Sequence, residues 1–126
     1  MKIGLAVIAS LAIFSAAGMA SAGTPSEVGY ASGSLAVGDL MTGKLDRAER
    51  ILAAQSAEDA RDPARLINLG IVYARSGRTE QARASFAAAR DTTDETLVLS
   101  DGREASSRVV AQQQLAMLGQ ATMAAR

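Results

Sequence analysis

The sequence contains no cysteine, no histidine and no tryptophan, and each absence excludes a class of chemistry. Without cysteine the chain has no disulfide, thiol nucleophile, thiolate metal site or lipidated cysteine. Without histidine it lacks the usual general base near neutral pH and the commonest metal ligand. Aromatic residues make up only 3%, and acidic and basic residues balance at 13 each. We therefore expect no metal, no cofactor and no nucleic-acid partner.

The N-terminus has the pattern of a secretory signal peptide over residues 1–22. Lys2 is followed by an apolar run, and Ala20-Ser21-Ala22 is a small-residue cleavage site, so cleavage is expected before Gly23. An uncleaved membrane anchor is the alternative, because no charge occurs between Lys2 and Glu27. Arginine greatly outnumbers lysine amid abundant alanine and glycine, which is typical of a bacterium with GC-rich codons. We expect a periplasmic or secreted protein.

The rest of the chain is long enough for one compact domain, and 48% of the residues are hydrophobic. Residues 23–33 (GTPSEVGYASG) are rich in glycine and serine without a helical period, so we expect a flexible leader. Helical spacing follows, and we expect the domain to span residues 34–118. The tail over residues 119–126 is expected to fray.

The clearest predicted helix begins at Pro63, where Asp62 can cap the first turn and proline suits the first helical position. Gly77 can supply the left-handed residue that ends it. Its inward face is expected to consist of residues spaced i, i+3, i+4 and i+7: Leu66, Leu69, Gly70 and Tyr73.

A second predicted helix follows within two residues, with Thr79 as its expected cap. Its inward face has the spacing i, i+4, i+7 and consists of Ala82, Phe86 and Ala89. A turn this short makes the two helices antiparallel. The small residues Gly70 and Ala82 are expected to let the helix backbones approach closely.

One internal match occurs at an offset of 34 residues, where Gly43 to Leu52 (GKLDRAERIL) aligns with Gly77 to Phe86 (GRTEQARASF). Residues 66–89 resemble the tetratricopeptide repeat (TPR) in the positions Leu66, Leu69, Gly70, Tyr73, Gly77, Ala82, Phe86 and Ala89. The departures are Leu66 in place of tryptophan and Asp94 in place of proline. The resemblance implies an all-α fold of about one and a half antiparallel repeats over residues 34–94.

Such a short stack needs a cover on its exposed flank. A helix capped by Ser106-Ser107 is the candidate, with the expected inward residues Val109, Val110, Gln113, Leu115 and Leu118. Between the repeat and this capping helix, residues 97–105 have an apolar run and an Asp101-Gly102 turn. A small β-hairpin and an irregular loop are both compatible with that pattern.

The one pattern of catalytic type is Gly38-x4-Gly43-Lys44, a near match to the phosphate-binding P-loop. Leu45 stands where the magnesium-binding Ser or Thr is needed, and no apolar strand precedes Gly38, so we interpret Gly43 as a turn glycine. Lys44 has no serine placed beside it by a motif. Two acidic pairs are expected to be solvated ends of helices or loops: Glu58-Asp59 and Asp94-Glu95. We expect no enzymatic activity.

The TPR resemblance implies a partner groove along the first helix of the repeat, lined here by Ile67, Asn68, Ile71 and Arg75. Asn68 matches an asparagine that holds the peptide backbone in family members with a carboxylate clamp. Burial of the two isoleucines in the protein's own core is the alternative. We expect a non-catalytic protein–protein interaction module, an adaptor or scaffold component of an envelope complex that binds a protein or peptide. A self-associating homodimer is the alternative, followed by a non-catalytic enzyme subunit.

Overall fold

The computed structural model of the chain describes residues 24–124, so the expected signal peptide and its cleavage site lie outside the described residues. The described part is mainly helical, with one small antiparallel sheet. No helix within it is long and apolar enough to cross a membrane. Its elements in chain order are α2 (Val37–Met41), α3 (Leu45–Leu52), the 3-10 turn η1 (Asp59–Arg61), α4 (Pro63–Arg75), α5 (Thr79–Asp91), β1 (Thr96–Val98), β2 (Glu104–Ser106) and α6 (Ser107–Ala124).

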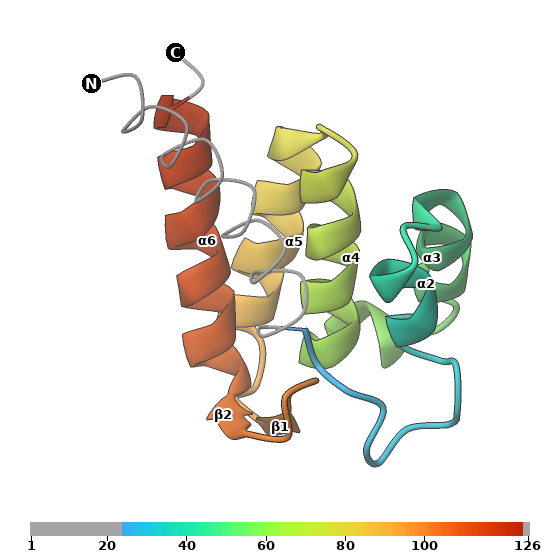
Figure 1. The fold of residues 1–126 in the computed structure, drawn as a ribbon. Helices are drawn as coiled ribbons and strands as arrows, with labels where there is room; N and C mark the ends of the chain where they lie inside the picture. Colours follow the sequence, from blue (N-terminus) through green and yellow to red (C-terminus); the bar gives the residue numbers. More distant parts are fainter. Residues whose placement is uncertain (1–23, 125–126) are drawn as a thin grey trace.

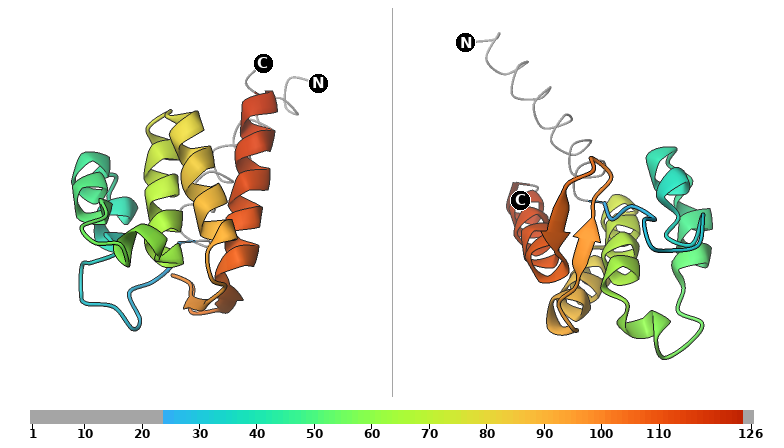
Figure 2. Two further views of the ribbon diagram at one scale, coloured as in Figure 1. Left: turned by 180° about the vertical axis from the view of Figure 1, so that it is seen from behind. Right: turned by 90° about the horizontal axis from the view of Figure 1, so that it is seen from below.

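The helices lie side by side in the order α6, α5, α4 and then the pair α2 and α3 (Figures 1 and 2). α4 is therefore central, and it packs against α5 and α6 on one side and against α3 on the other. The prediction of a helix buried along one face is wrong in this respect. Both sides of α4 contribute buried residues, which are Ala64, Ile67, Asn68, Gly70, Ile71 and Val72.

The ends of α4 follow the local sequence signals. The carboxylate of Asp62 accepts a hydrogen bond from the Ala64 amide at 3.0 Å, so the predicted cap is confirmed. Gly77 has φ +78°, the left-handed conformation expected at the end of the helix. The expected cap of α5 is wrong, because Thr79 is already its first helical residue and Arg78 holds the cap position without a side-chain hydrogen bond.

α4 and α5 pack closely together, as the short turn predicts. The expected inward residues of α5 are all fully buried, namely Ala82, Phe86 and Ala89. Gly70 of α4 lies directly against the ring of Phe86. The expected inward residues of α4 other than Gly70 are half-buried and border the core: Leu66, Leu69 and Tyr73.

The turn between α2 and α3 has the same hydrogen bonds as the turn between α4 and α5, displaced by 34 residues. Gly43 and Gly77 both have left-handed backbones, with φ +77° and +78°. Ala48 and Ala82 are both fully buried in the following helices. In each turn a side-chain hydroxyl donates to a backbone carbonyl, Thr42 to Gly38 in the first and Ser76 to Val72 in the second. In each turn a backbone amide also donates to a backbone carbonyl, Lys44 to Asp39 in the first and Arg78 to Tyr73 in the second.

Residues 24–36, the N-terminal strap, run across the end of α4 to the β-hairpin (Figure 1). The Ser26 amide donates to the Val98 carbonyl at 2.7 Å, and the Ser100 amide donates to the Thr24 carbonyl at 2.8 Å. Pro25 forms a β-bridge with Leu99 and is buried. The expectation of a leader without a fold is therefore wrong for residues 24–33. The partners that hold it on the rest of the protein, such as Val98 and Asn68, lie far along the chain, where a search for local periodicity does not find them.

The segment after α5 forms the hairpin rather than an irregular loop. β1 and β2 pair antiparallel with Leu97 opposite Ala105, and Gly102 in the connecting turn has φ +87°. Leu97 and Leu99 are buried. The hairpin therefore contributes apolar side chains to the core and offers β1 as the edge on which the strap docks.

α6 starts where the sequence predicts, but its length and its buried face differ. Asp94 accepts hydrogen bonds from the Arg108 amide at 3.1 Å and from the Ser106 hydroxyl at 2.6 Å, and Ser106 accepts from the Val109 amide. The helix continues to Ala124, so the expected end near residue 118 is wrong. Its buried residues are Ser107, Val110, Ala111, Gln114 and Leu118, whereas Val109 and Gln113 are exposed and Leu115 is half-buried.

Candidate interaction surfaces

The residues expected to line a partner groove on α4 do not form an open surface. Ile67 and Asn68 are fully buried, and Ile71 is 4% exposed. The hydrogen bonds of Asn68 and Arg75 lead to the strap and to α2, so this side of α4 faces the protein's own N-terminal half. The two isoleucines therefore belong to the protein's own core, which was the alternative to a partner groove.

Asn68 holds a polypeptide backbone, but the backbone belongs to this chain. Its side-chain amide donates to the carbonyl of Leu35 at 2.9 Å and approaches that of Pro25 at 3.5 Å. The buried amide oxygen of Asn68 has no hydrogen-bond partner among residues 24–124. The Leu35 carbonyl would be buried without a donor if the amide of Asn68 were removed, and such a loss is costly. Asn68 therefore stabilises the strap against α4.

Arg75 also contacts the chain itself. Its guanidinium donates to the carbonyl of Leu40 near the end of α2. A carbonyl in the last turn of a helix has no partner within that helix, and a cation there is favourable. Arg75 therefore fixes α2 on α4 and is already engaged on the side where the sequence expected a partner.

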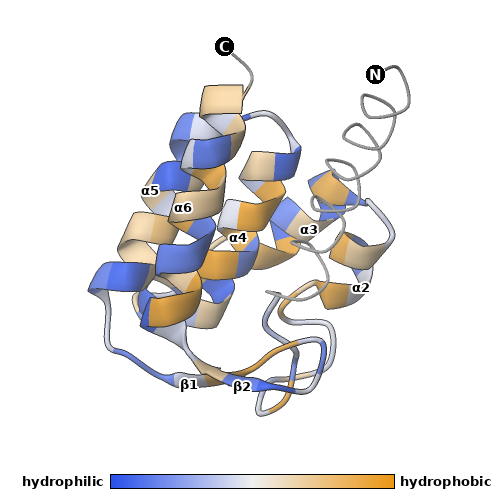
Figure 3. Cartoon of the chain, turned by 60° about the vertical axis from the view of Figure 1, so that its left-hand side comes forward, coloured by the Kyte–Doolittle hydropathy of each residue, from blue (hydrophilic) through white to orange (hydrophobic). Residues whose placement is uncertain are grey.

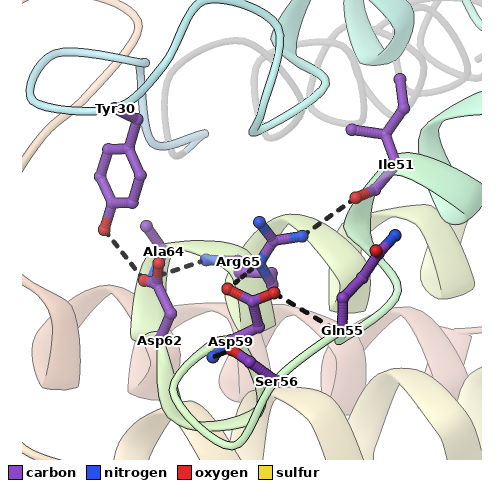
Figure 4. A network of polar contacts seen from close by, with 8 residues as sticks. All are labelled: Tyr30, Ile51, Gln55, Ser56, Asp59, Asp62, Ala64 and Arg65. Atoms are coloured by element: carbon purple, nitrogen blue, oxygen red, sulfur yellow. Dashed lines mark hydrogen bonds and ion pairs between the residues drawn. The ribbon is translucent and has the colours of Figure 1, made fainter.

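A polar network joins the strap, α4 and the end of α3 (Figure 4). The Tyr30 hydroxyl donates to the Asp62 carboxylate at 2.9 Å. Burial and this hydrogen bond raise the pKa of Tyr30 far above its ordinary value. Arg65 donates to the carbonyl of Ile51 at 3.0 Å and lies 3.8 Å from the Asp59 carboxylate. These contacts hold the connecting segments in place, and the buried Nε of Arg65, which has no hydrogen-bond partner among residues 24–124, is the atom that lies nearest the Asp59 carboxylate.

The residues of the P-loop-like pattern do not form a phosphate cradle. Gly38 lies inside α2, and Lys44 precedes α3. They border an open cleft of about 620 Å³ that also contains Glu27 and Asp39. Acidic groups in the cleft oppose an anion there, and Asp39 lies 3.6 Å from Arg47.

The two acidic pairs have structural partners as well. Asp59 lies beside Arg65, and Asp94 accepts hydrogen bonds at the start of α6, which lower its pKa below the ordinary value. The largest cause is the Ser106 hydroxyl, followed by the Arg108 amide. Within residues 24–124, no group of three or more acidic, histidine or cysteine side chains could hold a metal ion.

The outer side of α6 is an open surface, and among residues 24–124 the other exposed large apolar side chains, Val28 and Met41, lie outside this helix. This surface is a stripe of five exposed residues, which we call the outer stripe: Val109, Gln112, Ala116, Gln120 and Met123. Val109 is 46% exposed and Met123 is 73% exposed, so each of these large apolar side chains is in contact with solvent in the single chain. Helical geometry places all five within one face, opposite the buried face of α6. The stripe contains no charge.

The part of α6 that follows Arg108 also lacks charge, because no acidic or basic residue occurs between Arg108 and Arg126. Figure 3, turned to bring this end of the molecule forward, shows hydrophilic and hydrophobic bands alternating along α6. The hydrophilic bands arise from glutamines. Sequence reasoning placed Val109 and Gln113 in the core and so missed this surface. The uncharged run of residues 109–124 was the signal that could have indicated it.

Comparison of the chain with protein-family models, with curated proteins and with solved structures finds no match.

Proposed function

We propose that the chain is an exported, non-catalytic protein–protein interaction module that serves as an adaptor or scaffold component of an envelope complex. The observation that supports binding is the outer stripe, an exposed and uncharged helix face with Val109 and Met123 near its two ends. An uncharged helix face with exposed apolar side chains can be covered by another protein without burying a charge. The binding face is then α6, since the α4 side is covered by the strap.

The proposal includes the TPR resemblance over residues 34–94. The support is the pair of turns at Gly43 and Gly77, whose backbone angles and hydrogen bonds agree at the offset of 34 residues. In this reading α4 and α5 are one complete repeat, α2 and α3 are a shortened one, and α6 is the capping helix. A further helix or another protein can pack against the outer face of a capping helix when that face is uncharged.

Binding is tested by a photo-crosslinking amino acid introduced singly at Gln112, in the middle region of the stripe, and at Ala84 on the exposed side of α5 as the control. The full chain is expressed in a diderm bacterium and irradiated in cells. Discrete adducts, identified by mass spectrometry, are expected from position 112 and not from position 84. The absence of adducts from position 112, or equal adducts from both positions, contradicts the proposal.

Export is tested with the same cells by fractionation and N-terminal sequencing. A periplasmic protein that begins at Gly23 is the expected result, because Ala20-Ser21-Ala22 is the small-residue site. A chain that keeps its first residues and sediments with the membrane contradicts cleavage and supports the anchor. Ala22→Leu is the matched variant, in which processing before Gly23 should be slowed.

A further inference from the structure

The outer stripe of α6 has a two-fold order centred on Ala116. Val109 and Met123 lie seven residues to either side of it, and Gln112 and Gln120 lie four residues to either side. All five are exposed. When two copies of one helix pair antiparallel about a two-fold axis through Ala116, each residue meets the one equally far on the other side of the centre. The stripe is therefore complementary to itself.

The chemistry of each facing pair is favourable. Val109 of one copy meets Met123 of the other, which buries two side chains that are exposed in the single chain. Gln112 meets Gln120, and each side-chain amide has both a donor and an acceptor for its counterpart. Ala116 meets Ala116, and a small residue at the centre lets the helices approach closely.

The surroundings of the stripe also permit a second copy. α6 is at one end of the row of helices (Figure 1), so no helix or strand of residues 24–124 covers its outer side. The charged residue nearest the stripe, Arg108, is directed to the carbonyls of Arg90 and Thr92. The exposed side of α5, in contrast, contains charges, including Glu80 and Asp91. Two α6 helices meet without repulsion between like charges.

We propose that the partner of the outer stripe is a second copy of this chain, paired antiparallel through α6 about a two-fold axis at Ala116. This inference rests on the proposed function, in which α6 is the binding face. A single helix pair is smaller than the roughly 800 Å² per partner of a standard interface. We therefore expect a reversible dimer with a dissociation constant in the micromolar range.

The absence of cysteine makes the arrangement testable by disulfide formation without background. Ala116→Cys should form a symmetric disulfide under mild oxidation, because position 116 meets itself. Val109→Cys alone should not, but Val109→Cys mixed with Met123→Cys should give the mixed disulfide. Ala84→Cys on the exposed side of α5 is the control and should stay monomeric. A disulfide of Val109→Cys with itself instead indicates parallel helices and overturns the proposed arrangement.

Sedimentation of the exported protein, in the form in which the cells release it, measures the dimer directly. Ala116→Glu brings two carboxylates together at the axis and should weaken dimerisation at least about tenfold. Ala84→Glu should leave it unchanged, and circular dichroism checks that both variants keep their helices. A monomeric parent protein at several hundred micromolar overturns the inference, as does a dimer in which Ala116→Cys forms no disulfide. The proposed function survives either result if position 112 crosslinks to a different protein in cells.

Discussion

The ring of Phe86 fills the space that a side chain on residue 70 would need. A Cβ added to Gly70 would overlap with Cε1 of that ring and lie 2.6 Å from its Cδ1. The ring is fully buried between α4 and α5. Because neither the ring nor the helix backbone can move freely in a packed core, this contact sets how closely the two helices approach.

Gly70→Leu should therefore destabilise the protein by about 1–3 kcal/mol or more through overpacking. Gly70→Ala should also destabilise it, although alanine is the better helix former. Chemical denaturation followed by circular dichroism measures both. Gly38→Ala is the matched control, because its Cβ would meet no atom within 4 Å. In the double variant Gly70→Ala with Phe86→Leu, the loss should be smaller than the sum of the single losses. Additive losses contradict the contact.

Asn68 should be needed for the ordered position of the strap. Asn68→Leu removes the donor to the Leu35 carbonyl and should cost about 1–3 kcal/mol. Hydrogen exchange should rise over residues 26–36 and stay slow over residues 82–89 of α5. Asn68→Asp keeps the shape of the side chain but places a buried carboxylate against the Leu35 carbonyl, so near neutral pH it should loosen the strap at least as much as Asn68→Leu does. Unchanged exchange in the strap in both variants contradicts the role given to Asn68.

The Asp94 carboxylate should make the free energy of unfolding fall in acid. Its folded-state pKa lies below the ordinary value of 3.8, so its contribution is present above that value and is lost as the pH falls through the folded-state pKa. Denaturation curves between pH 6 and about pH 2 should therefore show a smaller acid-induced loss in Asp94→Asn than in the parent protein. Equal losses in the two proteins contradict this role for the carboxylate.

Tyr30 should stay protonated in the folded protein at pH values where a free tyrosine ionises. Its folded-state pKa is raised above the ordinary tyrosine value of 10.0, so the stability it contributes is present below pH 10 and falls as the pH rises further. The tyrosinate absorbance of the parent protein minus that of Tyr30→Phe isolates this group. The difference should develop well above pH 10, and a difference centred at 10 contradicts the buried hydrogen bond to Asp62.

The sequence predicted those parts of the fold whose signals are local. Asp62 and Pro63 mark the start of α4, Gly77 marks its end, and the spacing of Ala82 and Phe86 identifies the buried face of α5. Caps, turns and helical periodicity arise from residues within one or two turns of each other, so a single sequence is enough to find them.

The strap and the face of α6 could not be predicted in this way. The strap has no period, and its position depends on Asn68 and Val98, which are distant in sequence. α6 has apolar residues on nearly all sides, including Val109, Val110 and Leu115, so spacing alone does not select the inward face. The prediction of a groove on α4 was wrong because the strap, whose position has no local signal, covers that side of the helix.

The docking of the strap on the hairpin has a consequence for the order of folding. Ser26 and Val98, which share a backbone hydrogen bond, are separated by 72 positions in the chain. The earliest described segment to be synthesised therefore obtains this partner only after most of the chain has been made. A nascent chain that ends before the hairpin leaves the strap without this partner and leaves the side of α5 that packs against α6 uncovered. Completion of the C-terminal third is what closes the molecule, so a truncated product should be recognised by proteases or chaperones.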